Sequence, residues 1–222
     1  MEKKKIRKVL KIFLIVILLV ILLLLIHTIR NFMVIKKLQQ NVEPYLSRTN
    51  YHIKSVATES SGIVVTMNYY QKDNKQVCFM ERNNNGDITK ISMYNNGERT
   101  DIFTETANSK TVKLNGNGIM SVQIFDYLQT DNSWQTFLAS ITAKIKKTEY
   151  NEKECYIIND FFSTMSLNGT DKNEVYLQKD TGLYVKSIID TTSSEREYEF
   201  DNVDDSIFAE PDISQYTLKE NE

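Results

Sequence analysis

The feature that most constrains this chain is an unbroken apolar run near its N-terminus, IFLIVILLVILLLLI, from Ile12 to Ile26. The basic residues ahead of it are Lys3, Lys4, Lys5, Arg7, Lys8 and Lys11. Such a run is stable only where a membrane or another protein covers it. With its apolar flanks it reaches the roughly 20 residues that cross a hydrocarbon core of about 30 Å. The sequence therefore predicts a transmembrane helix over 9–29, with Ile12, Leu18 and Leu24 in lipid.

Two kinds of targeting segment fit this pattern, an uncleaved signal anchor and a cleaved secretory signal. The apolar run is at the upper limit for a cleaved signal, and the residues after Ile26 are too bulky or charged for a cleavage site. A lipoprotein signal needs an early cysteine, whereas the first one here is Cys78. An uncleaved anchor is favoured. The positive-inside rule then predicts a single-pass protein of the cell membrane, with residues 1–8 cytoplasmic and the C-terminal domain extracytoplasmic.

Charge separates the anchor from the rest of the chain. Of 27 basic and 29 acidic residues, seven basic residues and Glu2 lie in residues 1–30, which leaves 20 basic and 28 acidic residues, a net charge of −8. An acidic exported domain lacks the basic face that nucleic acid requires. We therefore expect the lipid bilayer as one partner and no nucleic acid.

The segment 30–47 follows the anchor directly. Phe32, Ile35, Leu38 and Val42 recur at spacings of three to four residues, which is typical of one face of a helix. We expect a helical stalk that holds the domain off the membrane. The alternative is a helix that packs on the domain.

The remainder, 48–222, is expected to be one extracytoplasmic β-rich domain. Residues 63–70 alternate between apolar and polar in the manner of a half-buried strand. Turn sequences at 73–74, 84–86 and 95–97 lie about eleven residues apart, which predicts a meander of antiparallel hairpins. Strand-like segments return between 145 and 200.

Two amphipathic helices are predicted between these strands, over 121–128 and 133–143, with Ser121 and Ser133 as N-caps. In the second helix the apolar residues recur at i, i+3, i+4 and i+7. They are Trp134, Phe137, Leu138 and Ile141. We expect them to line an apolar cavity or to form part of a lid. The predicted fold is mainly β (α+β): a curled antiparallel sheet or incomplete β-barrel with two or three helices as a lid.

Several of these features together resemble the bacterial lipoprotein-carrier superfamily. They are tyrosine-rich hairpins, a helical insertion, the hairpin VYLQKDTGLYVK from Val175 to Lys186, and the ending FAEPD from Phe208 to Asp212. The resemblance covers 45–215 as a pattern and implies an incomplete β-barrel, closed by a helical lid, that carries acyl chains. It assigns no functional residue. The chain departs from the soluble carriers because it keeps an anchor, so it cannot shuttle between membranes.

The sequence offers little for catalysis. His27 belongs to the anchor, and His52, at the start of a strand, is expected to have an ordinary surface or packing role. No nucleophile elbow, metal-binding pair of histidines or cysteines, or phosphate-binding loop is present. The acidic cluster Asp201, Asp204 and Asp205 lacks the spacing of a calcium loop and is expected to be a solvated turn. We therefore expect no enzyme, no metal and no cofactor.

Two questions stay open. Cys78 and Cys155 are both predicted to be exported, so they either form a disulfide or remain as buried thiols. The function is either binding of lipid or acyl chains in an apolar cavity, or a role as an envelope protein-interaction or assembly module with a filled core.

The topology is testable. Because the basic flank lies ahead of Ile12 and no cleavage site follows, the full-length protein should remain in the membrane fraction. Reporter fusions at the C-terminus should be active only outside the cytoplasm. A mature protein that lacks residues 1–30 and appears in the medium would contradict the anchor.

Overall fold

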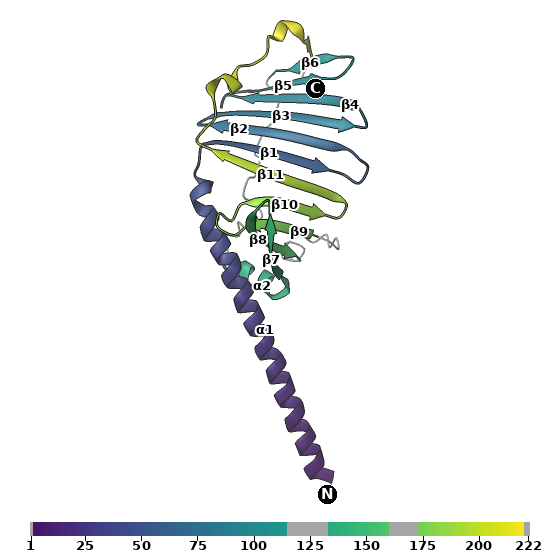
Figure 1. Ribbon diagram of the computed structural model, residues 1–222, viewed down its shortest axis with the longest axis vertical. Coiled ribbons are helices and arrows are strands. Elements are labelled where there is room, and N and C mark those ends of the chain that lie inside the picture. Colours follow the sequence, from purple (N-terminus) through teal and green to yellow (C-terminus); the bar gives the residue numbers. More distant parts are fainter. Residues whose placement is uncertain (1, 115–132, 160–172, 220–222) are drawn as a thin grey trace.

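The computed structural model describes residues 2–114, 133–159 and 173–219 (Figure 1). In these ranges a long helix, α1 (Glu2–Leu46), leads into a β-sheet, and a short helix, α2 (Ser133–Thr142), lies beside α1. The strands are β1 (Asn50–Thr58), β2 (Val64–Lys72), β3 (Lys75–Asn84), β4 (Asp87–Asn95), β5 (Thr100–Glu105), β6 (Lys110–Lys113), β7 (Lys144–Tyr150), β8 (Lys153–Asn159), β9 (Asn173–Gln178), β10 (Tyr184–Ile189), β11 (Thr192–Phe200) and β12 (Thr217–Leu218).

The twelve described strands form one open sheet in the order β12-β6-β5-β4-β3-β2-β1-β11-β10-β9-β8-β7. Two antiparallel meanders, β1–β6 and β7–β11, meet where β1 pairs with β11, and β12 adds a short parallel edge beside β6. The mainly β prediction is confirmed at this level. The sheet is not a closed barrel, since β12 and β7 are its two edges.

The hairpin turns lie where the sequence predicts them. Asp73, Asn85, Gly86 and Gly97 all have positive φ, between 52° and 97°. Asn, Asp and Gly tolerate this conformation with little strain, which is why they mark tight turns. The even spacing of these turns produces the β1–β5 meander.

The first part of α1 lies outside the protein core. All its large apolar residues from Val9 to Ile26 are exposed, including Ile12, Leu18 and Leu24. By length and composition the helix is able to cross a membrane. It fits either a membrane anchor or a signal sequence.

The second part of α1 packs on the sheet. Ile35 and Leu38 are buried in one cluster with Val175, Leu177 and other residues of β8–β10. The expected stalk over 30–47 is therefore a packed helix, which is the alternative that the sequence left open. Its apolar stripe is buried because the adjoining end of the sheet presents an apolar face of its own.

The turn between β9 and β10 fits closely against α1. A Cβ on Gly182 would lie 2.3 Å from the Leu38 carbonyl oxygen and 3.1 Å from Val42 Cβ, and the residue has φ +70°. One turn further along α1, Asn41 donates a hydrogen bond to the Lys179 carbonyl oxygen at 2.8 Å. Only glycine allows the two backbones to come this close.

The helix α2 packs on α1 through small side chains. Ala139, Ser140 and Ala143 are buried, and so is Asn31 of α1. The Asn31 amide donates to the carbonyl oxygens of Ser140 (3.2 Å) and Ala143 (2.7 Å). Carbonyl groups at a helix C-terminus have no partner within the helix, so Asn31 caps α2 from the neighbouring helix.

The C-terminal segment covers the opposite face of the sheet. Val77, Tyr94, Phe103 and Val112 of β3–β6 form a cluster there, and the 3-10 helices Asp205–Phe208 and Ile213–Gln215 pack on it. Neighbouring residues on one strand point to opposite faces, so Val77 faces this segment while Cys78 faces the α1 side. The two faces of the sheet are thus covered by opposite ends of the chain.

The close contact at Gly182 predicts the effect of a methyl group. Gly182→Ala should lower the free energy of unfolding because the added Cβ meets the Leu38 carbonyl oxygen. Gly86→Ala is the matched control, since Gly86 also has positive φ but no atom lies within 4 Å of the place that its methyl group would take. Gly182→Ala should be less stable than Gly86→Ala by about 1–3 kcal/mol, measured by unfolding of the full-length protein in detergent. Equal stability of the two variants would contradict the packing of α1.

Candidate functional site

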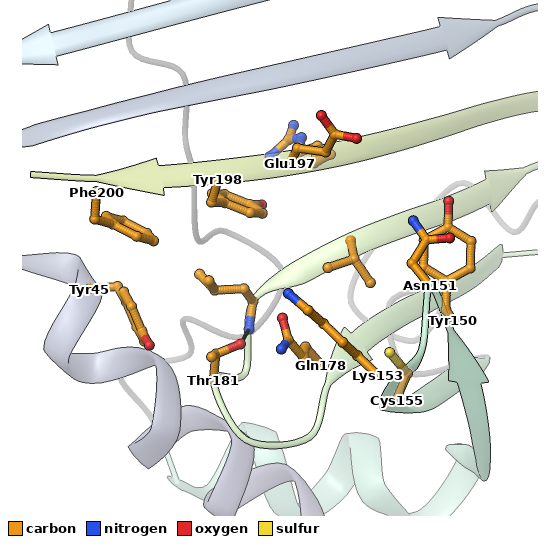
Figure 2. A pocket seen from close by; sticks show the side chains of 13 residues that line it. Tyr45, Tyr150, Asn151, Lys153, Cys155, Gln178, Thr181, Glu197, Tyr198 and Phe200 are labelled. Atoms are coloured by element: carbon orange, nitrogen blue, oxygen red, sulfur yellow. Dashed lines mark hydrogen bonds between the residues drawn. The ribbon is translucent and has the colours of Figure 1, made fainter. Parts of the chain in front are cut away.

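The sheet opens into a wedge between β10 and β11. The two strands pair from Lys186↔Glu195 to Ile189↔Thr192, whereas residues 196–200 of β11 pair with β1. The register of β10 shifts between Tyr184 and Lys186, where it pairs with β9. Such a bulge bends a strand and raises its local twist. A cavity of about 290 Å³ lies in the wedge (Figure 2).

One side of this wedge cavity is aromatic. Tyr45, at the end of α1, lies 4.9 Å from the Phe200 ring, and Phe200 stacks with Tyr198 at 6.3 Å (Figure 2). The Tyr198 hydroxyl donates to the Tyr184 carbonyl oxygen at 2.7 Å and so bridges the two diverging strands. Leu183 and Val185 of the β10 side complete the apolar lining.

The other side of the wedge cavity is polar. Its lining residues come from the β7–β8 turn and from the β9–β10 hairpin: Tyr150, Asn151, Lys153, Cys155, Gln178 and Thr181. Figure 2 shows the Lys153 side chain directed among the other labelled residues, while the Glu197 carboxylate points away from them. A cation and several neutral polar groups therefore face the aromatic wall.

Arg196 is the most unusual residue of the lining. Its guanidinium carbon lies 4.7 Å from the centre of the Tyr184 ring. Its Nε and Nη1 atoms are buried and, among the described residues, have no hydrogen-bond partner. Buried donors of this kind are rare in folded proteins and mark a site that needs explanation.

The four residues predicted to form a cavity or lid lie elsewhere. The helix over 133–143 is present as α2, but Trp134, Leu138 and Ile141 are 62%, 42% and 46% exposed. Phe137 contacts Phe32 of α1 at 5.8 Å. None of the four lines the wedge cavity. The sequence predicted that the large apolar residues of α2 face the protein interior, but α2 buries its small residues instead. The reason is that α2 packs closely on another helix, α1. The helix predicted over 121–128 lies outside the described residues.

Both cysteines are free thiols, so the open question of a disulfide is resolved against one. Burial raises the pKa of the Cys78 thiol from 9.0 to about 11, within a cluster that includes Ile53 and Tyr69. Burial also raises the pKa of Cys155, which lines the wedge cavity.

The other polar residues that the sequence singled out have packing roles. His52 stacks on Tyr70 at 4.2 Å and contacts Asn68 and Glu199 at 3.1 and 3.3 Å. In the acidic cluster, Asp204 caps a 3-10 helix by accepting from the Ser206 amide. Asp201 and Asp205 form ion pairs with Arg48 and Lys72. Within the described ranges no group of three or more His, Cys, Asp or Glu residues is placed to hold a metal.

Comparison with known proteins gives no assignment. No protein-family model matches the chain, and no curated protein matches it. Among solved structures it is similar to a DUF1329 family protein from Desulfovibrio piger ATCC 29098, with 10% sequence identity and a TM-score of 0.30, over 82% of this chain and 97% of that one. A likeness of this degree carries no argument about fold or function, so the site has to be interpreted from its own geometry.

The thiols provide a test of the wedge cavity. At pH 8 a thiol with a pKa of about 11 carries about a hundredfold less thiolate than one with a pKa of 9.0. Native protein should therefore react slowly with N-ethylmaleimide, and Cys155 should react before Cys78 because it borders a cavity. Mass spectrometry of the wild type and of Cys78→Ser would assign each rate, with denatured protein as the fast reference. Rapid labelling of native Cys78 would contradict its burial.

Proposed function

We propose that the chain is a membrane-anchored extracytoplasmic binding domain whose wedge cavity holds one acyl chain, or an apolar group of similar size, of an amphiphilic ligand. The observation that carries this proposal is the aromatic wall of Tyr45, Tyr198 and Phe200 facing a polar wall across an open cavity. Ligand sites combine apolar linings with a few placed polar groups in this way. The volume of about 290 Å³ lies at the lower end of the range for ligand pockets, which suits a single chain and not a whole lipid.

The length of the anchor helix determines how far from the membrane the cavity would bind its ligand. From Ile29, at the end of the predicted span, to Tyr45, at the wedge cavity, the helix rises about 24 Å at 1.5 Å per residue. Since the second half of α1 packs on the sheet, the cavity is held at this height. The ligand would reach it from the extracytoplasmic side or after leaving the bilayer. The role proposed is therefore to hold a ligand at the membrane and not to carry it away.

A second candidate function rests on a different observation. Trp134, Leu138 and Ile141 form an exposed apolar stripe on α2, beside the anchor helix. Exposed apolar surface of this kind often marks a protein–protein contact. It favours the envelope interaction or assembly module that the sequence left open, with the wedge cavity as an incidental gap in the sheet.

A photoreactive fatty acid separates the two functions. The full-length protein in detergent is irradiated with this probe, and the labelled peptides are mapped by mass spectrometry. We expect labelling within residues 183–200 of the wild type. Val185→Phe should reduce it about tenfold, because the larger side chain fills part of a pocket near the lower size limit. Val64→Phe, the same change outside the cavity lining, should leave it unaltered.

Labelling of residues 9–29, where the probe enters the detergent micelle around the helix, serves as an internal control and should be equal in all variants. Wild-type protein labelled only in this segment would refute acyl binding. If Leu138→Glu then changed the size of the complex isolated from membranes, the interaction module would be favoured instead.

A further inference from the structure

We propose that the exposed face of α2 rests on the outer surface of the bilayer that α1 crosses, with Trp134 at the depth of the lipid headgroups. This inference rests on the anchoring part of the proposed function and is independent of the wedge cavity. The juxtaposition that carries it is an apolar face of α2 held beside α1 where the predicted transmembrane span ends.

The contacts between the two helices place α2 close to the end of the predicted span. Asn31 donates hydrogen bonds to C-terminal carbonyl groups of α2, and the ring centres of Phe32 and Phe137 lie 5.8 Å apart. From Ile29 to Phe32, α1 rises only about 4.5 Å at 1.5 Å per residue. The headgroup layer on each side of the hydrocarbon core is about 5–8 Å thick. The contact therefore lies at the depth of the headgroups, and Figure 1 shows α2 at the end of the domain nearest the N-terminal part of α1.

The face of α2 opposite its buried residues is apolar. Trp134, Leu138 and Ile141 follow one another at spacings of four and three residues, so they share one side of the helix, and all three are exposed. Contact with water is unfavourable for so much apolar surface on a helix of ten residues. Tryptophan is enriched at membrane interfaces, because its ring is apolar and its N–H is polar. The composition of this face suits a lipid surface.

Exposed apolar residues at this level also lie on α1, which favours lipid over a protein partner. The helix α2 covers the face of α1 that holds Asn31. Ile29 and Met33 lie two residues to either side of Asn31, and two residues turn a helix by about 200°, so both occupy the opposite face. They are 51% and 65% exposed. A single protein docked on α2 would leave that face in water, whereas lipid surrounds both helices.

The charge at this end of the domain matches lipid headgroups. The chain beyond residue 30 is acidic as a whole, but the ranges 30–42 and 133–148 contain no Asp or Glu. The stems of lysine side chains cover apolar surface while their charged ends reach the phosphates of the headgroups. The basic residues of the two ranges are Arg30, Lys36, Lys37, Lys144, Lys146 and Lys147. This end of the domain is therefore the one that an anionic membrane surface attracts.

The test uses the fluorescence of Trp134, the single tryptophan of the chain. The full-length protein is placed in nanodiscs of phosphatidylcholine whose acyl chains carry bromine near the carbonyl end, near the methyl end or not at all. Bromine near the carbonyl end should quench Trp134 most strongly, because the indole lies at the interface. Acrylamide, a quencher dissolved in water, should quench it at least about threefold less than an indole exposed to water.

The control moves the indole to the other end of the sheet. The double variant Trp134→Phe/Leu218→Trp places it on β12, the edge of the sheet opposite β7. Leu218 is 61% exposed and Trp134 is 62% exposed, so the two positions are matched. Acrylamide should quench the relocated indole strongly, and brominated lipid should leave it unaffected. Circular dichroism and the melting temperature establish that the variant is folded.

The basic residues are tested by adding phosphatidylglycerol, an anionic lipid, to the nanodiscs. It should weaken acrylamide quenching of Trp134 further in the wild type, because the lysines draw α2 onto the charged surface. Lys146→Gln/Lys147→Gln should abolish this gain. Lys75→Gln/Lys90→Gln, which removes the same charge from exposed positions on β3 and β4, should keep it. Loss of the gain in both double variants, or in neither, would overturn the contact of these lysines with headgroups.

The outcomes separate this inference from the proposed function. Acrylamide quenching of Trp134 as strong as that of the relocated indole would overturn the lipid contact. Shielding from acrylamide without quenching by brominated lipid would also overturn it and would indicate a protein contact on α2, which cross-linking would reveal if it is a second copy. Neither result changes the fatty-acid labelling expected in the wedge cavity. Protein that fails to enter nanodiscs at all would refute the anchor and, with it, both proposals.

Discussion

The structure depends on the contact between the second half of α1 and the β9–β10 end of the sheet. Gly182 lets the turn backbone reach the Leu38 carbonyl, Asn41 binds the Lys179 carbonyl, and Ile35 and Leu38 are buried beside the turn. Burial of each large aliphatic side chain contributes about 1.5–3 kcal/mol. The helix α1 is uninterrupted, so this contact also connects the apolar N-terminal segment to the sheet. The apolar N-terminal segment and the sheet are thus joined through one continuous helix.

The same contact positions one wall of the wedge cavity. Tyr45 reaches Phe200 only because α1 is held along the β9–β10 hairpin. The register of β10 shifts between Tyr184 and Lys186, whereas β11 pairs with β1 without a shift over residues 193–200. The residues that line the cavity come from the end of α1, two hairpins and one strand, which are far apart in sequence. The candidate site is therefore a product of tertiary packing and not of any local motif.

This origin explains which features the sequence could predict. The turns at Asp73, Gly86 and Gly97 and the apolar run near the N-terminus are local signals, and both were predicted. The inward face of α2 was not predicted correctly. Large apolar residues such as Trp134 suggest burial, whereas a close helix–helix contact requires small ones such as Ala139. The β1–β11 pairing that creates the wedge joins segments about 140 residues apart, and no local pattern records it. One signal for Arg196 was available: it occupies an inward position in the alternating strand EREYEF.

Local rules of sheet construction hold over most of the described sheet and fail together at the wedge. In β2–β4 the strands pair residue by residue without a shift of register. At the wedge, the register of β10 shifts, its pairing with β11 ends at Lys186↔Glu195, and two nitrogens of the half-buried Arg196 have no hydrogen-bond partner among the described residues. Each departure is unfavourable for folding by itself, and a well-packed sheet would avoid all three. Departures from local rules are often found at functional sites, and this is why the wedge is the place at which the proposed binding is to be tested.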